Sequence, residues 1–360
     1  MILRQVELLP YALPFRRPVR GETTRQGWLV ALHDHQGRRG LGDAACWPGF
    51  GAGHAATAAR LATLLPELSH ASFADLAAVE AWAQLEAATT PEVACAVEVA
   101  LLDLFAQRQG RSLAQLLAAH VDPALTPRDS VRLQVLVHDA DQAAAACEAG
   151  VTCFKLKVSA ADLDLPRARA IRAAIGPEAT LRLDANGAWS TPAEALAELE
   201  RFAELAPEWV EQPIPAGDLV AFAELRRQSP LPLALDEGLR ASADLERALE
   251  LAAADALVLK PTYLGGPLVA LRLARRAHAA GVRVIATHAL DSVVGRAAAL
   301  ALSACLPADE ACGLAPALAA DLGQLPAPLG GRQPLPTSPG QELGEPSLLV
   351  PAACGKKESP

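Results

Sequence analysis

The stretch that decides the fold is CFKLKVSAADLDLPRARAIRAAIGPEATLRLD, residues 153–184. It begins with a short run in which apolar residues alternate with lysine, and it ends with a second apolar run at 180–184. Between the two runs, residues 161–175 have the spacing of an amphipathic helix. A strand, a helix and a second strand in this order predict parallel strands joined by a right-handed crossover.

The same alternation continues on both sides of this unit. Further strand candidates are VRLQVLV (131–137), EWVEQP (208–213), LALDEG (233–238), ALVLKP (256–261) and VRVIATHAL (282–290). A second helical segment, GGPLVALRLARRAHAAG at 265–281, separates the last two. Repetition at this period predicts an α/β fold, a closed (β/α)7β TIM-like barrel rather than an open sheet.

The N-terminal part has a different pattern. Apolar runs at Ile2–Leu13, Gly27–His33 and Gly40–Ala45 predict antiparallel strands, and residues 54–117 have helical spacing. We therefore expect an α+β capping domain at 1–125 and the barrel at 126–320. The remaining segment, 321–360, is expected to return to the capping domain and to finish in a frayed tail.

The composition disfavours several classes of protein. The 360 residues are 51% hydrophobic and carry a formal net charge of −9, whereas a nucleic-acid binder needs a basic face. No stretch is apolar enough to span a membrane, and the N-terminus lacks the pattern of a signal peptide, so we expect a cytoplasmic protein. The seven cysteines form no CxxC pair and are expected to be buried thiols in a reducing compartment. A homo-oligomer is compatible with the sequence.

Ionisable residues stand at the ends of successive predicted strands. They are separated by 24 to 28 residues, about one strand–helix unit, from 157 through 184, 211, 236 and 260 to 288. The residues are Lys155 and Lys157, Asp184, Glu211, Asp236, Lys260, and the pair His288 and Asp291. All should therefore lie at the C-terminal mouth of one barrel, where barrel enzymes hold their active sites.

Three of these residues are predicted metal ligands. The carboxylates of Asp184, Glu211 and Asp236 would repel one another at one mouth unless a cation lay between them. Ligands that offer only oxygen suit Mg²⁺, or Mn²⁺, better than Zn²⁺.

The lysines suggest acid–base chemistry. Lys155 and Lys157 share one face of their strand because they are two residues apart. Two neighbouring ammonium groups near a metal should lower the pKa of at least one, which makes a neutral amine available as a general base. Lys260 follows a strand on the opposite side of the barrel and should face Lys157 across the substrate.

Each motif alone has a simpler interpretation. A KxK pattern is commonly a solvated strand edge, and Asp184 with Asn186 could form a helix cap and a turn. Glu211 and Asp236 could merely end their strands. The recurrence of charged residues in the same phase of successive units favours the functional interpretation.

These residues resemble the motifs of the enolase superfamily, in particular its muconate-cycloisomerase-like subgroup. The matching segments are FKLKV, LRLDANGAW, VEQP, LALDEG and VLKP. Other segments are similar to the o-succinylbenzoate synthase family: LPFRRPVRGETTRQGWLVAL, WPGFG, PEVACAVEVALLDL, THALDSVVGRAAALALSA and ACGLAPALAADL. One departure is Asp43, where this family is expected to have glutamate.

The resemblance implies a small-molecule carboxylate substrate and the Mg²⁺-dependent dehydration of 2-succinyl-6-hydroxy-2,4-cyclohexadiene-1-carboxylate to 2-succinylbenzoate in menaquinone biosynthesis. Lys157 would remove the proton next to the ring carboxylate, and Mg²⁺ would stabilise the resulting enediolate. Lys260 would hold its charge opposite, Lys155 would tune Lys157, and Asn186 and Glu237 would support the site from behind.

Substrate specificity is expected to come from the loops around the mouth. The candidate substrate-binding residues are Arg25, Phe50 in the WPGFG loop, Thr287, His288, Asp291, Ser292, Gly313 and Leu314. Arg25 could equally be a surface arginine, and His288 could serve only in packing.

Four alternatives remain open from the sequence. An N-succinylamino acid racemase or dipeptide epimerase would use the same two lysines, one on each face of the substrate, and muconate-type cycloisomerisation is a further alternative. A Schiff-base aldolase would use a lysine but would leave the three carboxylates without a role. A non-catalytic binding barrel would be indifferent to loss of metal.

Overall fold

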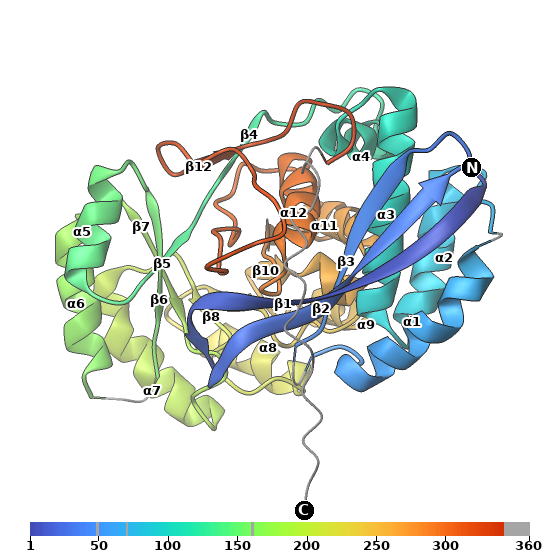
Figure 1. The fold of residues 1–360 in the computed structure, drawn as a ribbon. Coiled ribbons are helices and arrows are strands. Elements are labelled where there is room, and N and C mark those ends of the chain that lie inside the picture. Colours follow the sequence, from blue (N-terminus) through green and yellow to red (C-terminus); the bar gives the residue numbers. More distant parts are fainter. Residues whose placement is uncertain (48–49, 70, 160–161, 342–360) are drawn as a thin grey trace, which may run out of the picture.

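The computed structural model describes the whole chain except residues 48–49, 70, 160–161 and 342–360, and has two parts, a cap and a barrel (Figure 1). The frayed tail that was predicted lies outside the described residues. None of the described helices is long and apolar enough to cross a membrane.

The cap is a three-stranded antiparallel sheet packed on helices. Its elements are β1 (Leu3–Val19), β2 (Glu22–Asp34), β3 (Arg39–Ala45), α1 (His54–Leu68), α2 (Leu76–Ala87), α3 (Pro91–Gln109) and α4 (Leu113–Val121). The sheet order is β1-β2-β3. The prediction of an α+β cap is confirmed.

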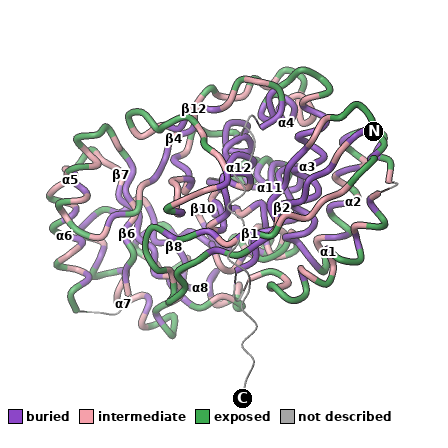
Figure 2. Tube along the Cα trace, viewed as in Figure 1, coloured by how far each residue is buried: buried purple, intermediate pink, exposed green. Residues whose placement is uncertain are grey.

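The sheet packs against α3 with almost no space between the two backbones. A Cβ atom on Gly42 of β3 would lie 1.7 Å from the carbonyl oxygen of Ala96, and one on Gly40 would lie 2.0 Å from that of Ala100. Only glycine therefore fits at these positions. Residues 91–106 of α3 are all buried, which makes this helix the centre of the cap (Figure 2).

Seven parallel strands and the helices around them form the barrel. The strands are β5 (Val135–Val137), β6 (Cys153–Lys157), β7 (Thr180–Asp184), β8 (Val210–Glu211), β9 (Leu233–Leu235), β10 (Ala256–Leu259) and β11 (Arg283–Ala286). The helices are α5 (Ala140–Glu148), α6 (Asp164–Ile175), α7 (Pro192–Phe202), η1 (Ala203–Leu205), α8 (Leu219–Gln228), α9 (Ser242–Glu250), α10 (Pro261–Leu264), α11 (Pro267–Ala279) and α12 (Val293–Ala304). The strands follow one another in sequence order across the sheet, as predicted for a barrel of the TIM type.

Residues 312–313 connect the two edges of this sheet. Cys312 forms a parallel bridge to Leu133 at the beginning of the barrel, and Gly313 forms one to Thr287 after β11. The eighth position of the barrel is therefore filled by a pair of single bridges rather than by a full strand.

The predicted run 131–137 is divided between two sheets. Its first part is β4 (Ser130–Arg132), which pairs antiparallel with β12 (Arg332–Pro334), and its second part, β5, pairs parallel with β6. Further along, the chain reaches the cap, because the amide N–H of Gln341 donates to Asp103 on α3 and its side chain donates to the carbonyl of Leu41.

Candidate active site

The register of the barrel strands brings the predicted charged residues to one level. Lys157 on β6 lies beside Asp184 on β7, and Asp184 lies beside Glu211 on β8. Asp236 and Lys260 follow directly after β9 and β10. Because the strands are parallel, their carboxyl ends form one rim, and all five side chains come from that rim.

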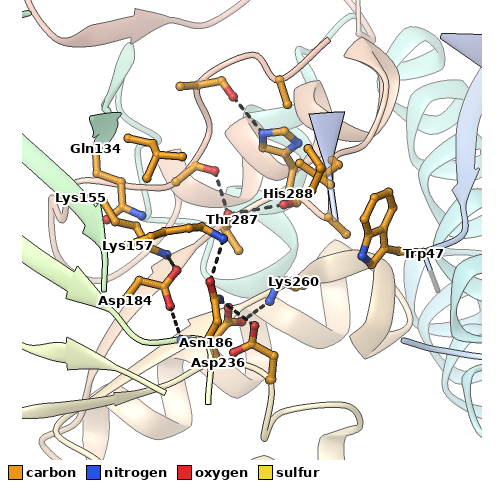
Figure 3. A pocket seen from close by; sticks show the side chains of 18 of the residues that line it. Trp47, Gln134, Lys155, Lys157, Asp184, Asn186, Asp236, Lys260, Thr287 and His288 are labelled. Atoms are coloured by element: carbon orange, nitrogen blue, oxygen red, sulfur yellow. Dashed lines mark hydrogen bonds and ion pairs between the residues drawn. The ribbon is translucent and has the colours of Figure 1, made fainter. Parts of the chain in front are cut away.

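A cavity of about 430 Å³ opens at this rim, between the barrel and the cap. Lys157 and Lys260 enter it from opposite sides, with Asn186 and Asp236 between them and Asp184 beside Lys155 (Figure 3). Of the residues predicted from sequence, those that line it are Phe50, Lys155, Lys157, Asp184, Asn186, Asp236, Glu237, Lys260, Thr287, His288 and Gly313. The volume suits a metabolite-sized ligand.

The Lys155 amino group lies between two of the predicted metal ligands. Its Nζ is 2.9 Å from Asp184 Oδ2 and 2.7 Å from Glu211 Oε1. Burial disfavours the charge on Lys155, but Asp184, Glu211 and Asp236 outweigh it and raise the pKa of the amine. The raised pKa of Lys155 is opposite to the lowered pKa expected from the neighbouring Lys157 ammonium, because the charges nearest to Lys155 are carboxylates.

The other two lysines have separate partners. Lys157 Nζ donates to Asn186 Oδ1 at 2.7 Å, and Asn186 Nδ2 donates to Glu237 Oε1 at 3.0 Å, so the asparagine links the lysine to the glutamate. Lys260 is paired with Asp236. Burial would raise the pKa of Asp236, but Lys260 and Lys155 overcome this and hold it below its usual value.

The donor set at the rim fits a hard divalent cation. Burial raises the pKa of Glu211 well above its usual range, and its Oε2 atom is buried without a hydrogen-bond partner. Asp184, Glu211 and Asp236 offer only oxygen, and oxygen atoms are the ligands that Mg²⁺ prefers. In the part of the chain that the structure describes, no three acidic, histidine or cysteine side chains surround one point, and Lys155 and Lys260 form ion pairs with these acids.

Four predicted substrate-binding residues do not line the cavity: Arg25, Asp291, Ser292 and Leu314. Arg25 is 1% exposed and donates to the carbonyls of Cys46 and Ala289, with Asp291 Oδ1 3.9 Å away. Leu314 is fully buried in the core.

A buried network around Asp43 joins the cap to the barrel. Tyr11 donates to Asp43 at 2.6 Å, and the backbone N–H and hydroxyl of Ser292 donate to the same carboxylate at 2.8 and 2.7 Å. Thr262 donates to Asp291 at 3.0 Å. In this structure the polar groups of Asp43, Asp291 and Ser292 are therefore used to hold the two parts together.

His288 is a neutral side chain in the wall of the cavity. Burial lowers its pKa to about 4, although its hydrogen bond to the carbonyl of Ala315 opposes the shift. Its Nε2 lies 2.9 Å from that oxygen. Because a carbonyl can only accept, Nε2 carries the proton.

Several residues of the site were not singled out from sequence. Gln212 has a left-handed backbone, with φ of 42°, and its Oε1 accepts from the amides of Asp236 and Gly238, which fixes the loop that carries Asp236. Gln134 faces the cavity and accepts from Arg182 at 2.8 Å. Tyr263 stacks on Phe50 with ring centroids 5.4 Å apart. Of these, only Gln212 had a signal, its place in the VEQP motif.

Comparison with known proteins assigns the barrel to a known family. A sequence model of the family described as "Enolase C-terminal domain-like" matches residues 138–341. The chain is 39% identical over 200 residues to o-succinylbenzoate synthase from Thermobifida fusca, a match covering 54% of this chain and 57% of the relative. It is 29% identical over 209 residues to N-succinyl-L-Arg/Lys racemase from Bacillus cereus, covering 58% and 57% of the two chains. The matched region thus spans little more than half of these relatives.

The fold is shared over nearly the whole chain. The structure of dipeptide epimerase from Enterococcus faecalis V583 complexed with Mg and the dipeptide L-Leu-L-Tyr superposes with a TM-score of 0.85. The superposition covers 95% of this chain and 99% of the epimerase, at 21% identity. This likeness extends to the cap as well as the barrel.

Proposed function

Because the chain belongs to the enolase C-terminal domain-like family, we propose that it is a metal-dependent enzyme that removes the proton next to a substrate carboxylate. The observation that carries the proposal is that two lysines enter one cavity from opposite sides together with Asp184 and Asp236, while Glu211 at the same rim is ion-paired with Lys155. The reaction needs a base that reaches the carbon–hydrogen bond and positive charge that faces the carboxylate. The lysines at this rim can provide the base and the positive charge.

Asp184, Glu211 and Asp236 would hold the cation, and Mg²⁺ is the ion that suits their oxygens. Bound there, it would supply positive charge opposite the carboxylate oxygens of the substrate. The relief of repulsion among the acids would then no longer depend on Lys155. Asn186 and Glu237 would position the Lys157 amine, since they form a hydrogen-bonded chain with it.

We further propose that the reaction is the dehydration catalysed by o-succinylbenzoate synthase. Lys157 acts as the base and takes the proton alpha to the ring carboxylate, the carbon–oxygen bond to the neighbouring hydroxyl breaks, and a new double bond completes the aromatic ring. The Lys157 ammonium returns its proton to the departing hydroxide, which leaves as water. The 39% identity to the Thermobifida fusca synthase is higher than the 29% identity to the Bacillus cereus racemase, which supports this choice.

A second candidate is racemisation or epimerisation of an N-acylated amino acid. Lys260 favours it, because a second amine across the cavity can return a proton to the opposite face. The relatives include a racemase of this type. Both candidates begin with the same proton abstraction and differ only in the second step.

The test uses purified protein with Mg²⁺ and two substrates. Loss of ultraviolet absorbance of 2-succinyl-6-hydroxy-2,4-cyclohexadiene-1-carboxylate reports dehydration, and Lys157→Ala should lower its rate by roughly 10²–10⁴-fold. The matched control is Arg169→Ala, an exposed cation paired with Glu204. No turnover by the unaltered enzyme would refute the synthase assignment.

Deuterium exchange into an N-succinylamino acid tests the second candidate. If racemisation is the function, Lys260→Ala should abolish inversion while one enantiomer still exchanges through Lys157. If neither substrate reacts or exchanges its α-proton with Mg²⁺ present, the proposal of proton abstraction from these two substrate classes fails.

A further inference from the structure

A second cavity, of about 470 Å³, lies behind the active-site wall. It is formed by β1, α12 and the segment that follows the barrel closure, and its lining includes Arg16, Arg296, Asp321 and Gln333. Pro316 lines both this cavity and the active-site cavity, so one short segment, 315–317, separates them. In Figure 1 this orange to red part of the chain runs close to β1.

Arg296 is an unusual residue for its position in the first turn of α12. Its side chain is only 7% exposed, and Nε is buried with no hydrogen-bond partner. Nη1 makes one long contact, 3.5 Å, to the carbonyl of Leu314. Among the residues that the structure describes, no carboxylate forms an ion pair with it. A buried charge without a counter-charge is costly, so a partner for Arg296 would stabilise the fold.

Arg16 brings a second guanidinium to the same cavity. Its Nε donates to the carbonyl of Leu318 at 2.9 Å, and its backbone N–H donates to Ala317 at 3.1 Å. Burial lowers the pKa of Arg296, Asp321 partly counters this, and Arg16 lowers the pKa further. The one carboxylate in the lining, Asp321, already accepts from the amides of Val293 and Leu322. The cavity therefore has an excess of positive charge.

We propose that this cavity binds a small oxyanion, a carboxylate or a phosphate, between Arg296 and Arg16. Guanidinium groups bind both classes through paired N–H donors, and an anion would form the ion pair with Arg296 that Asp321 does not form. The side chain of Gln333 is buried with its Oε1 unpartnered, so an anion that carries an O–H, such as hydrogen phosphate, would make one more hydrogen bond than a carboxylate.

The position of the cavity predicts an effect on the active site. Ala315 accepts from His288, and residues 315–317 line the catalytic cavity. Arg16 is bonded to the same segment through Ala317 and Leu318. An anion that draws Arg16 inward would shift this wall, so occupancy should change KM for the substrate more than kcat.

The proposal is tested by isothermal titration calorimetry of the 360-residue protein with inorganic phosphate and, separately, with succinate. Ionic strength is held constant with sodium chloride. We expect saturable binding of at least one anion, weakened at least tenfold in Arg296→Met and weakened also in Arg16→Met. The control Arg169→Met removes an exposed, distant cation and should bind as the unaltered enzyme does.

The lysines of the catalytic cavity could also attract anions, and Lys157→Met distinguishes the two sites. Binding that survives in Lys157→Met and is lost in Arg296→Met supports the proposal. Binding that is lost only in Lys157→Met overturns it, as does the absence of saturable binding of either anion. If Arg296→Met does not fold, unchanged binding in Arg16→Met overturns it as well. None of these outcomes depends on which reaction the enzyme catalyses.

Discussion

Replacement of Lys155 by methionine tests whether this amine balances the charges of the rim. The change keeps the length of the side chain but removes a cation 2.9 Å from Asp184 and 2.7 Å from Glu211, which are 2% and 0% exposed. At an effective dielectric constant near 20, each contact contributes roughly 6 kcal/mol of attraction, part of which offsets the cost of burying the amine. Removing one partner of such a buried group typically costs about 3–5 kcal/mol.

Thermal unfolding in EDTA at pH 8 measures this cost. For a chain of 360 residues, about 3–5 kcal/mol corresponds to a fall in Tm of roughly 4–7 °C. The matched control is Arg201→Met, which removes an exposed cation paired with Glu198 and should cost at most about 1 kcal/mol. Mg²⁺ should narrow the gap between Lys155→Met and the unaltered protein, since it would supply the missing charge.

The dependence on pH provides a second check. The pKa of Glu211 is already raised by burial, and loss of Lys155 would raise it further. Protonation of the acids would then relieve their repulsion, so the destabilisation should shrink as the pH falls from 8 to 5. If Lys155→Met unfolds in EDTA like the Arg201→Met control at every pH, the charge balance described for the rim is wrong.

Two further predictions concern the cap. Gly42→Ala should destabilise the protein by about 3 kcal/mol, because the added methyl group would lie 1.7 Å from the carbonyl oxygen of Ala96. Denaturant unfolding measures this loss of stability. The control is Gly281→Ala, whose Cβ meets open space and which should cost only ~1–2 kcal/mol for its positive φ. A loss for Gly42→Ala no larger than that of Gly281→Ala would contradict the close packing. Burial and the charge of Asp291 raise the pKa of Asp43 from 3.8 to about 6. The folded state therefore holds this proton more tightly than the unfolded state, and the stability it contributes is present below about pH 4 and lost as the pH rises to about 6. Asp43→Asn should flatten this part of the stability–pH profile, and an unchanged slope would argue against a protonated Asp43.

The barrel and its rim could be predicted because both follow from a short repeat. In a repeated strand–helix unit the parallel strands bring their carboxyl ends to one rim. The location of Asp184, Glu211 and Asp236 at that rim therefore follows from their spacing in the sequence. The same reasoning gave the two lysines on opposite sides of one cavity. Neither result needs a contact between distant parts of the chain beyond strand pairing.

The features that could not be predicted depend on long-range contacts. Arg25 carries no sign in the sequence that it is buried, since arginine is usually exposed, and its partners come from the cap and from the loop after β11. Ser292 and Asp43 are 249 positions apart, and their hydrogen bond appears only when the cap is docked. The ion pairs of Lys155 with Asp184 and Glu211 were not predicted either. Sequence spacing gives the order of residues along a strand but no distances between side chains on neighbouring strands.

The closure of the barrel at residues 312–313 has a consequence for synthesis on the ribosome. Two single bridges, to Leu133 and Thr287, complete the ring, and Gln341 is needed to finish the contacts of Asp103 on α3. The nascent chain therefore exposes an open sheet edge and an incomplete cap until residue 341 has been translated. Such unpaired edges are prone to aggregate, so this polypeptide should depend on chaperones during translation more than a protein of equal length built from local contacts.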